Sequence, residues 1–207
     1  MSKFQNRRDF LKYFVGSTIA LSGFDALAND LSTKKKIKQL TILYTNDQHS
    51  RIDPFPDNDP KYPGQGGFAK RATLIKEIRK QEENVLLLDA GDIFQGTPYF
   101  NYYHGELEFK LMSQMGYDAT TFGNHDFDMG IENIVTQMPH AAFSFLNCNY
   151  DFSDTALNDK VQPFKIFNKS GLKIGVFGIG IELEGLVPKH LYGTVKYTDP
   201  VACANTT

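Results

Sequence analysis

Apolar and amphipathic segments alternate along the chain between residues 40 and 149. The apolar segments predict four strands, at residues 40–47, 85–92, 117–126 and 143–149. The amphipathic segments predict three intervening helices, at residues 66–84, 105–116 and 130–138. Residues 85–92, VLLLDAGD, form a continuous apolar run, which is typical of a strand covered on both faces. This alternation predicts a layered α/β domain.

The pattern changes in the last third of the chain. Residues 161–180 contain two β-rich runs joined by Asn168–Gly171, which predicts a hairpin or a second sheet added to the α/β layers. Asp199–Pro200 is typical of the first turn of a helix, and the sequence stops soon afterwards. We therefore expect these 207 residues to be the front part of a longer protein.

Composition and charge narrow the class of protein. A hydrophobic content of 41% is enough for a packed core, and 207 residues suit one domain with a short appendage. The formal net charge of -2 gives no reason to expect a nucleic acid or an anionic membrane as a partner. Cys148 and Cys203 lie outside any CxxC pair, so neither a disulfide framework nor a metal or redox role is expected for them.

The N-terminus has the pattern of a cleavable export signal. Arg7 and Arg8 precede a short apolar run, which ends in the A-x-A site Ala26–Ala28. The paired arginines indicate twin-arginine export to the periplasm, and the run is too short and polar for a stable membrane span. The alternative is an ordinary basic amphipathic helix. We expect an export signal at residues 1–28, a linker at 29–39 and the functional domain at 40–207.

Polar side chains that can bind metal ions or transfer protons gather where the predicted strands end. The first strand leads into Asp47 and His49, and the second into Asp89 and Asp92. The third leads into the run GNHDFDMG at residues 123–130. Because parallel strands deliver their carboxyl ends to one edge of a sheet, we expect these side chains to meet there.

These residue types suit divalent metal ions. In Asp47-x-His49 the spacing of two residues puts both side chains on one face of an extended chain, so one ion can bind both. Asp92 follows the flexible Gly91, and its two carboxylate oxygens can bridge two ions. A pair of bridged ions is typical of phosphoryl-transfer sites.

Such a site also needs a proton donor near the leaving oxygen. His125 is the candidate, because it follows Asn124 directly in the same motif. A carboxylate would set its charge and orientation, and both Asp128 and Asp126 are close enough in sequence. Asp89 is expected to support the site rather than bind metal.

The motifs TNDQHSR, DAGD and GNHDFDMG, in this order, resemble those of the calcineurin-like metallophosphatases. More narrowly, they are similar to the N-terminal catalytic domain of the bacterial 5'-nucleotidase family. The resemblance covers the chain from about Leu40 to its end, and three motifs in order are far more specific than GNHD alone. It implies a layered α/β/β/α metallophosphatase sandwich, incomplete here at its C-terminal side.

The resemblance also implies roles for residues of the three motifs. Asp47 and His49 would bind the first metal ion. Asp92 would bridge the two ions, and Asn124 would bind the second.

His125 and Asp128 would form the catalytic dyad by the same resemblance. The family site usually adds histidines from later GH and GHTH motifs, and neither motif occurs here, since His140 and His190 do not match them. A separate or downstream domain that binds the nucleoside is a further implied partner.

The sequence therefore predicts a metal-dependent phosphoesterase. It would hydrolyse nucleotides or related phosphate monoesters with a water that two metal ions activate. Mn²⁺, Zn²⁺, Fe and Mg²⁺ all suit the mixed oxygen and nitrogen ligands. The alternatives are a phosphodiesterase acting on cyclic nucleotides and a truncated, non-catalytic metal-binding remnant.

Overall fold

A computed structural model describes residues 38–207, and Gln39–Thr207 form one compact unit. The export signal predicted at residues 1–28 lies outside the described residues, as does most of the linker predicted at residues 29–39. Among the residues described, no helix combines the length and the apolar character needed to cross a bilayer.

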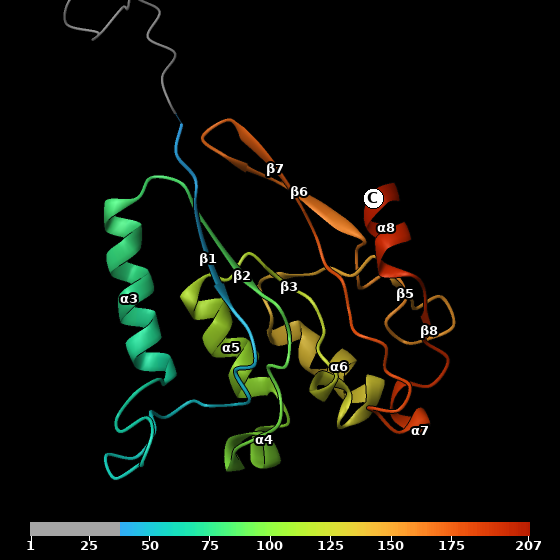
Figure 1. Cartoon of the computed structure of the whole chain (residues 1–207), viewed down its shortest axis with the longest axis horizontal. Coiled ribbons are helices and arrows are strands. Elements are labelled where there is room, and N and C mark those ends of the chain that lie inside the picture. Colours follow the sequence, from blue (N-terminus) through green and yellow to red (C-terminus); the bar gives the residue numbers. More distant parts are fainter. Residues whose placement is uncertain (1–37) are drawn as a thin grey trace, which may run out of the picture. The chain divides into compact units, whose positions relative to one another are not determined.

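Four parallel strands form the central sheet and lie side by side in the order in which they follow one another along the chain (Figure 1). They are β1 (Thr41–Thr45), β2 (Val85–Asp89), β3 (Ala119–Thr120) and β4 (Ser144–Phe145). Thr45 pairs with Asp89, and Asp89 pairs with Thr120, so the carboxyl ends of these strands meet at one edge. All four predicted strands are confirmed, but β3 and β4 are shorter than predicted because the polar residues after them form loops.

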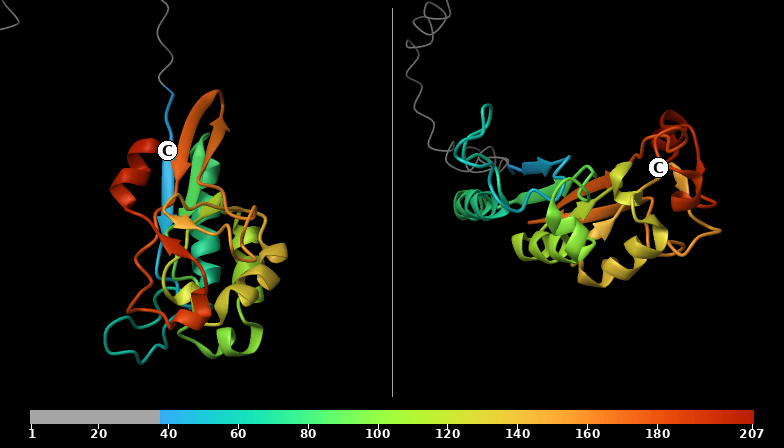
Figure 2. Two further views of the ribbon diagram at one scale, coloured as in Figure 1. Left: turned by 90° about the vertical axis from the view of Figure 1, so that its right-hand side faces the viewer. Right: turned by 90° about the horizontal axis from the view of Figure 1, so that it is seen from below.

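Three helices lie together on one side of this sheet (Figure 2). They are α3 (Phe68–Gln81), α5 (Glu106–Met115) and α6 (Gly130–Gln137). Each confirms a predicted helix, with ends that differ by a few residues at most. Gly116 stops α5 in the left-handed conformation, with φ of 73°, as a helix-terminating glycine does.

Aromatic side chains fill the space between the helices and the sheet, and some of them belong to the loops at the strand ends. Phe94 and Phe127 are fully buried and come from the loops after β2 and β3. The ring of Phe94 packs 5.0 Å from that of Phe109 in α5, and the ring of Phe127 packs 5.6 Å from that of Phe122. Burying such large apolar rings ties both loops to the core.

The other side of the sheet exposes apolar residues. Burial alternates along β1, and Ile42 and Tyr44 on this side are 53% and 75% exposed. The predicted hairpin is confirmed as the antiparallel pair β6 (Phe164–Lys169) and β7 (Leu172–Phe177). A parallel bridge between Leu146 and Gln162 joins the segment before this hairpin to the end of β4.

The remaining elements are short. They are α4 (Pro98–Tyr103), the 3-10 turns η1 (His125–Phe127) and η2 (Met138–His140), the antiparallel pair β5 (Tyr150–Asp151) and β8 (Lys196–Tyr197), α7 (Lys189–Tyr192) and α8 (Pro200–Thr206). Of these only α8 was predicted, and the Asp199 side chain caps it by accepting a hydrogen bond from the Ala202 N–H at 2.7 Å.

The described residues therefore form an α/β fold with a parallel sheet, which confirms the predicted fold class. Of the predicted α/β/β/α layers, they build one helical layer and one parallel sheet, with the β6–β7 hairpin attached at the β4 end. The site-forming loops after β1, β2 and β3 lie at the carboxyl edge of this sheet.

Candidate metal centre

The chain makes a tight left-handed turn directly after β1. Asp47, His49 and Ser50 have φ angles of 49°, 45° and 51°, a region that residues other than glycine rarely adopt. The turn is attached to the loop after β2, since the N–H groups of Asp47 and His49 donate to the carbonyls of Gly91 and Asp92, each at 3.0 Å. Asp47 and His49 therefore lie on one side of the chain, as predicted. The backbone between them forms a turn, however, and not the predicted extended chain.

Beneath this turn the intervening side chain enters a buried polar network. Gln48 is 4% exposed and donates to the Asp89 carboxylate at 2.6 Å. Asp89 also accepts from the Thr45 hydroxyl at 2.6 Å and from the Gly91 N–H at 2.9 Å. Burial raises the pKa of Asp89, and these donors oppose that effect. Asp89 thus supports the strand ends from below and lies outside the group of ligand atoms.

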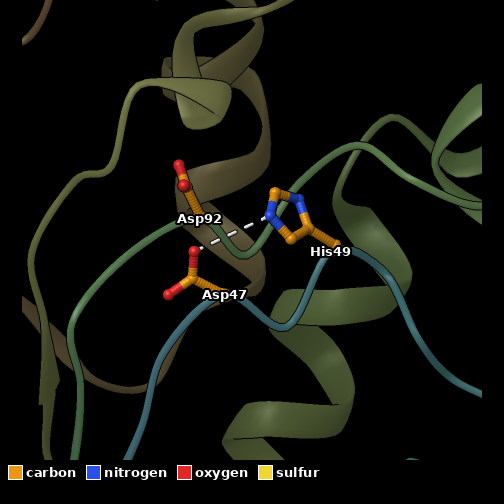
Figure 3. A group of neighbouring side chains, drawn as sticks. All are labelled: Asp47, His49 and Asp92. Carbon is orange, nitrogen blue, oxygen red and sulfur yellow. Dashed lines mark ion pairs between the residues drawn. The ribbon is translucent and has the colours of Figure 1, made fainter. Parts of the chain in front are cut away.

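Three side chains converge above the turn (Figure 3). One ligand atom from each of Asp47, His49 and Asp92 lies within 4.8 Å of the others. Ligands placed about 2.1 Å from one ion are at most about 4.2 Å apart, so small side-chain movements let this group hold a cation. His49 Nδ1 lies 3.3 Å from the Phe94 carbonyl, and Nε2 lies 3.8 Å from Asp47 Oδ1. A proton on Nδ1 leaves Nε2 free as the metal ligand.

The loops after β2 and β3 approach each other very closely. A Cβ on Gly91 would lie 2.2 Å from the Gly123 nitrogen, and a Cβ on Gly123 would lie 2.1 Å from Asp92 Oδ1. The His125 N–H donates to Asp92 Oδ1 at 2.9 Å. Asn124, which precedes His125, is therefore beside Asp92 in the fold, and its role as a ligand stays a prediction.

His125 pairs with one of its two candidate carboxylates. Its Nδ1 lies 2.9 Å from Asp128 Oδ2, whereas Asp126 is buried and accepts backbone N–H groups instead. The hydrogen bond to Asp128 raises the pKa of His125, burial opposes this, and the charge of Asp128 adds to it. The ring of His125 lies 5.1 Å from that of His49, centroid to centroid. The His125–Asp128 pair and the group of Asp47, His49 and Asp92 therefore lie at one site.

Several supporting contacts left no recognisable pattern in the sequence. The Arg71 guanidinium in α3 donates to the Gln48 side-chain oxygen, and the Phe94 carbonyl orients His49. Their partners lie far away along the chain, so spacing alone does not reveal them. The density of polar residues in GNHDFDMG is the only sequence signal for Asp126, which the motif offers as one of two candidate partners of His125.

Comparisons with known proteins agree with this geometry. Residues 40–194 match the calcineurin-like phosphoesterase family. The chain is 40% identical over 147 residues to snake venom 5'-nucleotidase from Gloydius brevicauda, and the aligned region covers 68% of this chain and 25% of that protein. It is 39% identical over 171 residues to 5'-nucleotidase from Vibrio cholerae, and here the aligned region covers 80% of this chain and 30% of that protein.

The fold is also similar to a solved structure, the 5'-nucleotidase precursor from Thermus thermophilus. The TM-score is 0.74 at 31% sequence identity, over 81% of this chain and 33% of that chain. The chain thus spans about a quarter to a third of the length of these relatives. The family match covers most of its length, and the chain belongs to the calcineurin-like phosphoesterase family.

Proposed function

We propose that this chain carries the metal-binding and proton-donating groups of a phosphoesterase that hydrolyses nucleotides or related phosphate monoesters. The observation that supports this most is the convergence of Asp47, His49 and Asp92 beside the His125–Asp128 pair. The relatives named 5'-nucleotidase favour a nucleotide as the substrate.

The donor atoms fit two divalent ions that share one carboxylate. Asp47, His49 and Asp92 would hold the first ion, and Asp92 and Asn124 would hold the other. Two ions bound there would lower the pKa of a water and neutralise charge on the phosphoryl oxygens.

His125 is suited to supply a proton to the leaving oxygen of the substrate. Its Nδ1–H donates to Asp128, so the proton on Nε2 is not used in this contact and is available to the substrate. Asp128 favours the protonated ring, so His125 holds a proton that it can release when the phosphoester bond breaks. Asp128 thereby fixes both the charge and the orientation of the acid.

We also propose that the protein reaches the periplasm through the twin-arginine route, based on Arg7, Arg8 and the Ala26–Ala28 site. Replacing both arginines by lysine should leave the precursor in the cytoplasmic fraction, measured by immunoblotting of cell fractions. Equal processing of wild type and variant would contradict this route.

The proposed activity is tested by metal analysis together with phosphate release. The purified wild-type chain is loaded with Mn²⁺ or Zn²⁺, and the bound ions are counted by elemental analysis. Phosphate release is then compared for a nucleoside 5'-monophosphate and a cyclic nucleotide. We expect two ions per chain and hydrolysis of the monophosphate.

Asp92→Asn should lose both ions and the activity, because Asp92 is the shared ligand. The matched control is Glu77→Gln, which removes a carboxylate from the exposed face of α3, where Glu77 pairs only with Lys80 among the residues that the structure describes. Preferential hydrolysis of the cyclic nucleotide would favour the phosphodiesterase. Two bound ions without phosphate release from either compound would favour the non-catalytic remnant.

A further inference from the structure

A single buried carboxylate at the site accepts hydrogen bonds from four backbone N–H groups. Asp126 is 4% exposed. Its Oδ1 accepts from the N–H groups of Ile93 at 2.9 Å and Phe94 at 3.2 Å. Its Oδ2 accepts from the N–H groups of Asp92 at 3.0 Å and Gly123 at 2.8 Å. Both oxygens are thus saturated with donors from the main chain.

These donors come from two different loops. Three consecutive N–H groups belong to the loop after β2, and the fourth belongs to the loop after β3. The first loop carries Asp92 and the second carries Asn124. A return contact closes the arrangement, since the His125 N–H donates to the Asp92 side chain at 2.9 Å. One carboxylate therefore holds together the segments that present the bridging ligand and the proposed ligand of the second ion.

The loop after β2 depends on such an acceptor. Asp92 has a φ of 55° and Gly91 a φ of 94°, so the chain has left the sheet and its N–H groups have no strand partner. A buried N–H group that is left without an acceptor destabilises the fold. The close approach of Gly91 and Gly123 leaves no room for a side chain at either position. Asp126 meets this need with both of its carboxylate oxygens.

We infer that Asp126 is a positioning residue, which sets the separation of Asp92 and Asn124 and thereby the affinity for the second metal ion. This inference rests on the proposed two-ion function. Residues that orient metal ligands through hydrogen bonds typically change metal affinity by roughly 10- to 100-fold when they are mutated. If Asp126 had only a structural role, mutating it would lower stability and leave metal affinity unchanged.

The test compares Asp126→Asn with Asp118→Asn. Asp118 precedes β3 and accepts from the Leu87 N–H and from Lys169, each at 2.9 Å, so its loss also removes support for the sheet. Mn²⁺ binding is measured by titration calorimetry, and the free energy of unfolding by urea denaturation. In Asp126→Asn we expect the second ion to bind at least about tenfold more weakly, with a smaller effect on the first. In Asp118→Asn we expect lower stability and wild-type binding of both ions.

A second readout follows the amides themselves. Hydrogen exchange of the N–H groups of residues 92–94 and 123 should accelerate in Asp126→Asn and stay slow in Asp118→Asn, because an amide side chain offers one acceptor oxygen in place of two. Should Asp126→Asn fail to fold, Asp126→Glu keeps the charge and both oxygens but adds a methylene. It is expected to retain the first ion and weaken the second.

The outcomes separate the two proposals. Fewer than two ions bound to the wild-type chain would refute the two-ion function and the positioning role that depends on it. Two ions in the wild type and unchanged affinity for both in the Asp126 variants would overturn only the positioning role. Equal loss of second-ion affinity in Asp118→Asn would also overturn it, since the effect would then follow stability.

Discussion

Among its neighbours, one side chain has the largest effect on the pKa of His125. Asp128 lies three residues further on and reaches His125 Nδ1 across the short turn η1. It is half-buried, so water only partly screens its effect on the pKa of His125. At the scale of single residues, the proposed chemistry therefore rests on this contact as much as on the metal ligands.

Asp128→Asn should lower kcat for phosphate release roughly 100-fold, within the range that general acid catalysis contributes. The amide keeps the shape of the side chain but no longer stabilises the protonated ring. Metal binding should stay at the wild-type level, because Asp128 lies outside the group formed by Asp47, His49 and Asp92. Steady-state kinetics beside titration with Mn²⁺ would check this, and an unchanged kcat would remove Asp128 from the mechanism.

A second residue-scale prediction concerns pH. Glu108 in α5 is fully buried, and neither its carboxylate oxygens nor the Ser50 hydroxyl beside it makes a hydrogen bond of good geometry to any of residues 38–207. Burial raises the pKa of Glu108 above its ordinary value, and Ser50 opposes this only in part. The folded chain therefore favours the neutral acid. The stability that the neutral carboxyl of Glu108 contributes is complete below its pKa in the unfolded chain. It is lost as pH rises through its pKa in the folded chain.

Glu108→Gln should accordingly reduce the loss of stability that accompanies rising pH above the ordinary pKa of a glutamate. Urea denaturation of wild type and variant over a series of pH values measures the difference. The surface variant Glu77→Gln should decline as the wild type does. If Glu108→Gln also declines like the wild type, the carboxyl of Glu108 is not the titrating group.

At the scale of elements, two loops must interlock for the site to form. The loops after β2 and β3 meet at Gly91 and Gly123, where neither backbone leaves space for a side chain. Buried Phe94 and Phe127 anchor the same loops in the core. The geometry of the proposed ligands Asp92 and Asn124 is thus a consequence of how the two strand ends pack.

Gly91→Ala should destabilise the fold by more than its backbone conformation explains. A left-handed alanine costs about 1–2 kcal/mol, and the overlap with Gly123 should add roughly 1–3 kcal/mol. Gly185→Ala is the matched control, since Gly185 has a φ of 83° and, beyond its two chain neighbours, no heavy atom of the described residues lies within 4 Å of where its Cβ would be. Chemical denaturation compares the two, and equal losses would show that the close approach contributes nothing.

At the scale of the whole molecule, the proposed ions would connect segments that are distant in sequence. Asp47 follows β1 and Asp92 follows β2, so a cation held by both adds a crosslink at the carboxyl edge of the sheet. The face of this sheet away from the helices carries the exposed apolar residues Ile42 and Tyr44, and Ile166 in the separate β6–β7 hairpin is exposed as well. The layer of helices thus supplies most of the packing that holds the strand ends in place.

Removing the metal should lower the thermal stability of the wild-type chain. An ion present at about 100 times its Kd stabilises the folded state by roughly 2.7 kcal/mol. For a domain of this size, a chelator should then lower Tm by roughly 2–4 °C for each kcal/mol. Calorimetry with and without chelator measures the shift. Asp92→Asn, which removes the proposed shared ligand, should unfold at one temperature in both buffers, and a chelator effect on that variant would place the ions elsewhere.

The order of strands and helices, the fold class and the clustering of polar residues at strand ends were predictable from the sequence alone. Hydrophobic periodicity is a local property, and parallel strands bring their carboxyl ends to one edge whatever their loops do. The sequence also narrowed the partner of His125 to two carboxylates. Only the tertiary structure decided between them, because Asp126 accepts hydrogen bonds from N–H groups that lie 32 to 34 residues away.

The left-handed turn after β1, the shortness of β3 and the Gln48–Asp89 contact were likewise decided by the tertiary structure. Each depends on which main-chain groups lack a strand partner once two loops are packed together. Side-chain type and spacing therefore determined what chemistry the chain can offer. The packing of distant segments determined which side chains are free to perform it, because buried N–H groups must first be given acceptors.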